Sequence, residues 1–187
     1  MGLVETIGLL IIGIIAIAVI WLVLAYNGFV TLRNRIENSW SQIDVQLKRR
    51  YDLVPNLIET VKGYTKHEKE TLKMVTEARA AITKAGSPKE KMAAENMLSG
   101  ALKSLFAVSE AYPDLKANQN FLMLQEELSG IESKLAYTRQ FYNDTVLAFN
   151  TKVETLPDSI IASAFGFRKN EYFRIEEAAR ENVKVQF

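Results

Sequence analysis

An uncharged apolar run near the start of the chain constrains the fold of this sequence more than any other feature. The run is "IGLLIIGIIAIAVIWLVLA", from Ile7 to Ala25, and it contains no charged side chain. As a helix it would rise roughly 28 Å, close to the ~30 Å hydrocarbon core of a bilayer. Trp21 and Tyr26 lie at its C-terminal end, where amphipathic rings favour the membrane–water interface. Residues 1–25 are therefore predicted to form a transmembrane anchor. Its membrane-spanning segment is expected to begin at Ile7 and to end at Ala25.

The anchor is predicted to be retained and to cross the membrane once. The leading "MGLVET" has no Lys or Arg, and the run is longer than the apolar region of a secretory signal peptide. Arg33 and Arg35 follow the run, whereas no cation precedes it. Because cationic residues beside a span stay in the cytoplasm, we expect the short N-terminus outside the cell and the C-terminal domain in the cytoplasm.

The composition excludes several kinds of site. Basic and acidic residues number 23 and 22 and are interspersed, so the chain lacks the basic face of a nucleic-acid-binding protein. The absence of cysteine excludes disulfides, thiolate metal sites and cysteine nucleophiles, and a single histidine excludes multi-histidine metal sites. No cofactor, metal or nucleic acid is expected.

Beyond the anchor, apolar residues recur in steps of three and four, which is typical of helices packed in a bundle. In the first segment they are Ile36, Trp40, Ile43, Leu47, Val54, Leu57, Val61, Tyr64, Val75, Ala78 and Ile82. This heptad-like pattern, shared with coiled coils, predicts one long helix that ends at "AGSP", residues 85–88. Ser87, Pro88 and Glu90 then form the capping box of a second helix.

Two proline-containing stretches mark the other boundaries. The second helix is expected to end at "YPDL", Tyr112 to Leu115, and a third to run as far as "LPDS", Leu156 to Ser159. The sequence therefore predicts an all-α fold, with the transmembrane helix followed by an elongated antiparallel bundle over residues 26–157. Its three helices are long, short and long.

The stretch "RRYDLVPNL", Arg49 to Leu57, places a proline inside the first of these helices. The apolar register is kept on both sides of Pro55, which favours one helix with a kink near Pro55 over two helices joined by a loop. A second helix capped by Asp52 is the alternative.

Charged residues in the apolar register predict a polar clamp inside the bundle. Arg50 and Glu68 both occupy such positions, and a buried charge is costly unless it is paired. We expect Arg50 to reach Glu127 or Glu132 on the third helix, and Arg139 of the third helix to reach an acidic residue on the first. The alternative is that Arg50 extends its guanidinium to solvent at the bundle edge.

Residues 158–187 differ in character from the bundle. "IIASAFGF", Ile160 to Phe167, is apolar, and the charged segment after it closes with "VKVQF". We expect this tail to pack its aromatic residues on the bundle. The alternative is an interfacial or partner-binding segment.

Three stretches resemble the LemA family of bacterial membrane proteins. They are "NSWSQIDVQLKRRYDLVPNLIETVKGYTKHE" (38–68), "YPDLKANQNFLMLQEELSGIESKLAYTRQFYND" (112–144) and the tail with "SIIASAFGF" and "VKVQF". The resemblance covers nearly the whole chain and implies one N-terminal span with an elongated helical bundle behind it in the bacterial cell membrane. It also implies a membrane zinc metalloprotease as a partner and a role in envelope quality control, and it supplies no catalytic residues.

Two functions are compatible with this sequence. The first is a non-enzymatic, membrane-anchored scaffold or adaptor that self-associates as a homo-oligomer or binds membrane partners. The alternative is a sensor or regulatory subunit of a membrane protease or signalling complex. No nucleophile-elbow, Walker or Rossmann motif is present, which argues against an enzyme. Candidate interaction residues are Trp40, Arg49, Phe165 and Phe167. For Trp40 a core position is the favoured explanation.

Overall fold

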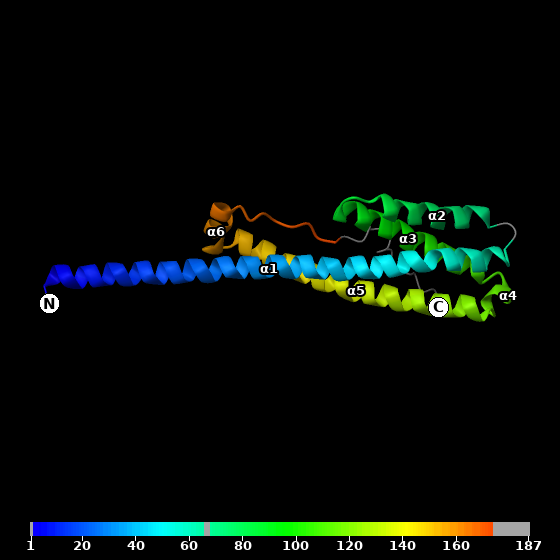
Figure 1. The fold of residues 1–187 in the computed structure, drawn as a ribbon, viewed down its shortest axis with the longest axis horizontal. Coiled ribbons are helices and arrows are strands. Elements are labelled where there is room, and N and C mark those ends of the chain that lie inside the picture. Colours follow the sequence, from blue (N-terminus) through cyan, green and yellow to red (C-terminus); the bar gives the residue numbers. More distant parts are fainter. Residues whose placement is uncertain (1, 66–67, 174–187) are drawn as a thin grey trace, which may run out of the picture. The chain divides into compact units, whose positions relative to one another are not determined.

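The computed structural model describes residues 2–65 and 68–173, and this part of the chain is mostly helical and contains no strand. Six helices follow one another along the chain (Figure 1): α1 (Leu3–Lys62), α2 (Lys69–Lys84), α3 (Pro88–Ser109), α4 (Pro113–Lys116), α5 (Gln119–Glu154) and α6 (Asp158–Phe165). The all-α fold predicted from the sequence is confirmed. The closing "VKVQF" lies outside the described residues.

The prediction of one helix from the anchor to residue 85 is wrong. α1 ends at Lys62, and a turn follows in which the Tyr64 and Thr65 amides both donate to the Val61 carbonyl at 3.0 Å. Gly63 occupies this turn, and glycine is about 1 kcal/mol less favourable than alanine in a helix. The apolar register continues into α2 because both helices face the same core, so a preserved register does not require a continuous helix.

The start of α3 agrees with its predicted capping box. The Ser87 hydroxyl accepts a hydrogen bond from the Glu90 amide at 3.2 Å, and the Glu90 carboxylate accepts one from the Ser87 amide at 3.2 Å. These bonds satisfy two amides that a helix N-terminus otherwise leaves without partners. Pro88 takes the first helical position, where no amide hydrogen is needed.

The described residues divide into two compact units. Unit 1 comprises residues 2–40 and 140–172, and unit 2 comprises residues 41–139 together with Phe173. Helices α1 and α5 contribute to both units. α1 also continues through Pro55 without interruption, so the alternative of a separate helix capped by Asp52 is wrong, while the kink at Pro55 stays a prediction.

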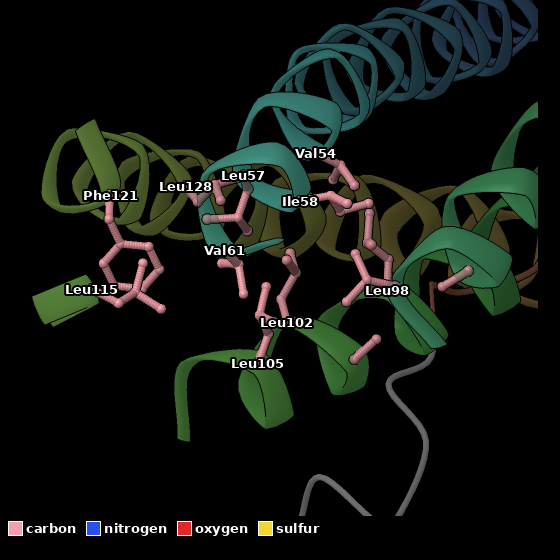
Figure 2. Close-up of a cluster of buried hydrophobic side chains, with 13 residues drawn as sticks. Val54, Leu57, Ile58, Val61, Leu98, Leu102, Leu105, Leu115, Phe121 and Leu128 are labelled. Atoms are coloured by element: carbon pink, nitrogen blue, oxygen red, sulfur yellow. The ribbon is translucent and has the colours of Figure 1, made fainter. Parts of the chain in front are cut away.

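The core of unit 2 is built from one face of each of its helices (Figure 2). Its fully buried side chains are Val54, Leu57 and Val61 of α1, Val75 of α2, Leu98, Leu102 and Leu105 of α3, Leu115 of α4, and Phe121 and Leu128 of α5. Their three- and four-residue spacing within each helix turns them toward a shared interior. The buried charged residues Arg50, Glu95 and Arg139 lie on the same helices as this core.

Unit 1 contains the apolar run and an aromatic cluster. None of residues 2–24 is buried, and the first buried position on α1 is Ala25. α1 is therefore a candidate membrane span by length and composition, and its packing begins at the predicted end of the span. Just beyond it, the Phe29 ring stacks on Phe167 with centroids 4.7 Å apart and meets Phe149 edge-on at 5.8 Å.

The described part of the tail packs on α1 and α5 within unit 1. Phe167 lies against Phe29 as above, and further along the Asn150 side chain and the Asn170 backbone exchange two hydrogen bonds of 2.9 and 3.0 Å. The Tyr142 hydroxyl donates to the Glu171 carbonyl at 3.1 Å. Gly166 ends α6 with φ of 74°, a left-handed conformation that side chains other than glycine's rarely adopt. These contacts hold residues 167–171 of the tail against α1 and α5.

Candidate functional site

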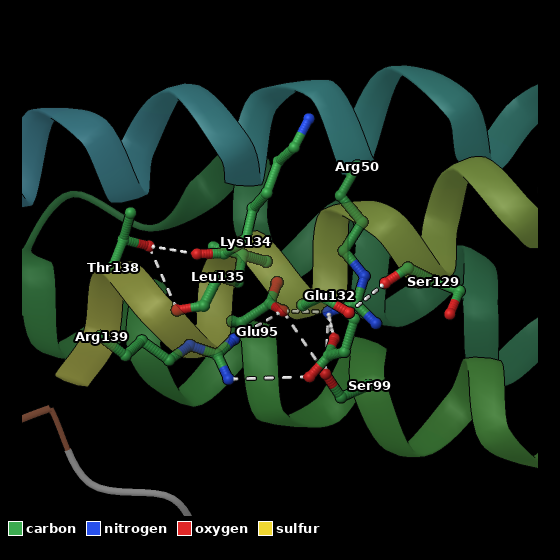
Figure 3. A network of polar contacts seen from close by, with 10 residues as sticks. Arg50, Glu95, Ser99, Ser129, Glu132, Lys134, Leu135, Thr138 and Arg139 are labelled. Carbon is green, nitrogen blue, oxygen red and sulfur yellow. Dashed lines mark hydrogen bonds and ion pairs between the residues drawn. The ribbon is translucent and has the colours of Figure 1, made fainter.

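A buried cluster of four charged residues connects three helices of unit 2 (Figure 3). Arg50 comes from α1, Glu95 from α3, and Glu132 and Arg139 from α5. Glu95 is 0% exposed, Arg50 4% and Arg139 7%, so three of the four are withdrawn from water. The Glu132 side chain is 44% exposed and forms the solvent edge of the cluster.

Glu95 is the centre of this cluster. Its Oε1 atom forms an ion pair with Nη1 of Arg50 and accepts a 3.0 Å hydrogen bond from Nη2 of Arg139. Arg50 also donates to the Ser99 hydroxyl at 2.9 Å. On the solvent side, Glu132 lies 2.6 Å from Arg50 and 3.9 Å from Arg139. Two guanidiniums and two carboxylates thus neutralise one another.

The helical spacing explains why these side chains meet. Arg50 takes the place of an apolar residue between Leu47 and Val54 on α1, so it points into the bundle. Glu132 and Arg139 are two helical turns apart on α5, which puts them on the same face. All four charges therefore converge because each lies on the core-facing side of its helix.

Burial dominates the electrostatics of Glu95. Withdrawal from water raises the pKa of its carboxyl above the ordinary value of 4.5, while the guanidiniums of Arg50 and Arg139 act in the opposite direction. Among the described residues, Oε2 of Glu95 and the Nε atoms of both arginines have no hydrogen-bond partner. The pairing therefore compensates only part of the desolvation of these groups.

This pKa shift predicts how stability depends on pH. Because the folded state binds the Glu95 proton more tightly than the unfolded chain, its stabilisation is complete below the unfolded pKa and is lost as pH rises through the folded pKa. The unfolding free energy of the wild type minus that of Glu95→Gln should therefore fall as the pH rises above the ordinary carboxyl pKa of 4.5. Urea unfolding of both full-length chains in detergent measures this difference, and an increase with pH would contradict the assignment.

A cavity of about 240 Å³ adjoins the cluster on the side of Glu132. Its polar lining includes Arg50, Ser99 and Glu132, and its apolar lining includes Leu102, Phe106 and Leu128. It thus offers both charged and apolar surface to a small occupant. Within the described residues, no group of three or more His, Asp or Glu side chains is arranged to hold a metal ion.

Three of the five residues predicted for the polar clamp come together. Arg50, Glu132 and Arg139 lie in the cluster. Arg139 pairs with Glu95 of α3 and Glu132 of α5, however, and not with the acidic residue of α1 that was expected. Glu127 is exposed on α5 and takes no part in the clamp. Glu68 precedes α2 and accepts a 3.0 Å hydrogen bond from the Tyr112 hydroxyl, because the end of α1 at Lys62 moves it out of the register that suggested burial.

Sequence reasoning missed Glu95, the most buried member. The signal was nevertheless present, since Glu95 precedes Leu98, Leu102 and Leu105 at steps of three, four and three residues. A charge in the register of the apolar residues is also the pattern that singled out Arg50.

The predicted interaction residues have different environments. Trp40 is half-buried, and its ring meets that of Tyr142 edge-on with centroids 5.8 Å apart. Arg49 is exposed on α1, next to the buried Arg50. Phe165 is 52% exposed, whereas Phe167 is half-buried in the aromatic cluster with Phe29. Arg49 and Phe165 therefore remain accessible in this chain.

Comparison with known proteins identifies relatives along most of the chain. The sequence model of the LemA family matches residues 39–187. Protein LemA of Metamycoplasma hominis is 30% identical over 155 residues, which cover 81% of this chain and 69% of the relative. Magnetosome protein MamQ of Magnetospirillum gryphiswaldense is 22% identical over 183 residues, with 84% and 67% covered. Magnetosome protein MamQ 2 of Paramagnetospirillum magneticum is 23% identical over 183 residues, which cover 84% of this chain and 67% of the relative.

Proposed function

Since this chain belongs to the LemA family of membrane-associated helical proteins, we propose that it is a non-enzymatic scaffold that is anchored by α1 and self-associates through α5. The apolar run on α1 anchors the protein by crossing the bilayer once. Arg33 and Arg35 favour an arrangement with the N-terminus outside and the helical units in the cytoplasm. Envelope quality control is the process in which such a scaffold would act.

The observation that carries this proposal is an aromatic pair on the outside of α5. Tyr137 is 81% exposed and Phe141 is 53% exposed, and the two are one helical turn apart. Aromatic side chains are enriched at the centres of protein interfaces and among the residues that dominate binding energy. Both side chains are large enough to anchor a contact with a second copy of the chain. We name Tyr137 and Phe141 the α5 aromatic pair.

Anchoring strengthens any such contact. Chains confined to one membrane meet at a higher effective concentration than chains free in solution, so a modest surface is enough to sustain an oligomer. The charged cluster of Arg50, Glu95, Glu132 and Arg139 also supports a structural and not a catalytic role. Its guanidiniums and carboxylates are occupied with one another, whereas acid–base catalysis requires groups that are poised to exchange protons with a substrate.

A charge within the α5 aromatic pair should break the oligomer. Phe141→Asp places a carboxylate where the proposed interface excludes water, so the mass of the gently solubilised full-length protein is expected to fall toward that of the monomer. Gln140→Asp introduces the same charge at the adjacent exposed position and should leave the mass unchanged. Light scattering of the detergent-solubilised proteins measures both masses. Equal masses for the two variants would rule out the α5 aromatic pair as the interface.

A regulatory subunit of a membrane metalloprotease is the second candidate, and the cavity beside Glu132 is the observation that favours it. A ligand or unfolded segment that enters this cavity would compete with Glu132 for Arg50, because both line the same space. The two functions differ in what co-purifies from gently solubilised membranes. A defined homo-oligomer supports the scaffold, and a monomer bound to a protease supports the regulator.

A further inference from the structure

Three large apolar side chains on and next to α6 are exposed in unit 1. Leu156 is 78% exposed, Ile160 is 62% exposed and Phe165 is 52% exposed. Another side of α6 packs within the unit, where Ile161 and Ala162 are buried. We name Leu156, Ile160 and Phe165 the α6 apolar surface.

The position of this surface follows from one ring contact. The Phe165 ring lies against that of Tyr26, with centroids 4.9 Å apart. Tyr26 is the residue directly after the apolar run that ends at Ala25. The end of α6 is therefore held at the level where the membrane-spanning part of α1 emerges, and Figure 1 shows α6 beside this part of α1.

The neighbouring charges suit the same location. Lys152 forms a 2.7 Å ion pair with Asp158, the first residue of α6, and Lys169 pairs with Glu154. Arg168 is exposed three residues after Phe165. The exposed cations Arg168 and Lys169 and the ring of Tyr26 thus adjoin this apolar surface, a combination that matches the membrane–water interface, where acyl chains meet anionic headgroups.

We propose that the α6 apolar surface inserts into the interface of the same bilayer that α1 crosses. Unit 1 then contacts the membrane at two points, the span itself and α6. Exposure of three large apolar side chains to water is thereby avoided without a protein partner, because the acyl chains cover them. The inference rests on the transmembrane anchoring of α1 that the proposed function includes.

Fluorescent probes on single cysteines test this placement in the full-length chain, which has no cysteine of its own. An environment-sensitive nitrobenzoxadiazole probe is attached at Ile160→Cys, and the protein is reconstituted in phosphatidylcholine–phosphatidylglycerol vesicles. Glu37→Cys is the aqueous control, since Glu37 is exposed on α1 at roughly 18 Å along the helix from Ala25. Ile14→Cys, within the apolar run, reports the span.

The expected result is a blue-shifted emission at position 160 that is quenched by nitroxides placed shallowly on the acyl chains and protected from aqueous iodide. The probe at position 37 should respond to iodide instead. If the probe at position 160 behaves like the one at position 37, or is shielded from both quenchers by a second protein surface, the proposal is wrong. A probe at position 14 that escapes deep nitroxides would instead refute the transmembrane anchor, so the two failures are distinguishable.

Discussion

Replacement of Glu95 by alanine is expected to lower the free energy of unfolding by about 3–5 kcal/mol, the usual effect of removing one partner from a buried ion pair. Arg50 and Arg139 both lose the acceptor they share, and both remain buried. Glu95→Gln should lose less, because the amide oxygen still accepts hydrogen bonds from both guanidiniums. Urea unfolding of the full-length chain in detergent measures these changes.

Two further variants test whether the loss of stability comes from leaving buried charges without a partner. Glu127→Ala removes an exposed glutamate of α5 and should change stability by less than about 0.5 kcal/mol. The triple variant Arg50→Met, Glu95→Leu and Arg139→Met removes all three buried charges, and it should recover most of the stability because apolar residues can replace buried ion pairs. If Glu95→Ala is as stable as Glu127→Ala, the cluster does not hold the three helices together.

Replacement of Phe29 by alanine is expected to cost about 3–5 kcal/mol, as is typical of a fully buried aromatic residue. The Phe29 ring is 0% exposed and contacts the rings of Phe149 and Phe167, while the Lys152 ammonium lies 5.0 Å from its centroid. Its loss would leave a cavity between α1, α5 and the tail within unit 1.

Leu147→Ala is the control for this variant, because it removes a large apolar side chain from a position of α5 in unit 1 that is 55% exposed. Its effect on unfolding should be well below 1 kcal/mol. Protease sensitivity of the tail offers a second measurement, since the loss of Phe29 should expose the chain around Phe167. Equal stability of the two variants would contradict the aromatic cluster as the core of unit 1.

The parts of the fold that could be predicted are those that depend on local spacing. The apolar run, the capping box at Ser87 and the inward direction of Arg50 all follow from periodicity or from a capping pattern within a few residues. The end of α1 could not be predicted in this way. Two successive helices that face one core can keep the same three- and four-residue spacing of apolar residues. The spacing therefore does not reveal the turn after Lys62.

The candidate site was predicted in part for a similar reason. Arg50, Glu132 and Arg139 are charges at core-facing positions, and a buried charge requires a partner. Which partner it finds depends on how the helices are aligned, and helix spacing alone does not determine this alignment. Arg50 was expected to pair with Glu127 or Glu132 of α5, and it does pair with Glu132. Its second carboxylate partner, Glu95, comes from α3 instead.

Disulfide cross-linking in native membranes tests the self-associating scaffold most directly. Tyr137→Cys places the only cysteine of the chain in the α5 aromatic pair, and Lys103→Cys places it on the exposed side of α3 as a control. With mild oxidant we expect a covalent dimer from Tyr137→Cys and little from Lys103→Cys. Only monomer from Tyr137→Cys, or an equal yield from both positions, would contradict self-association through α5.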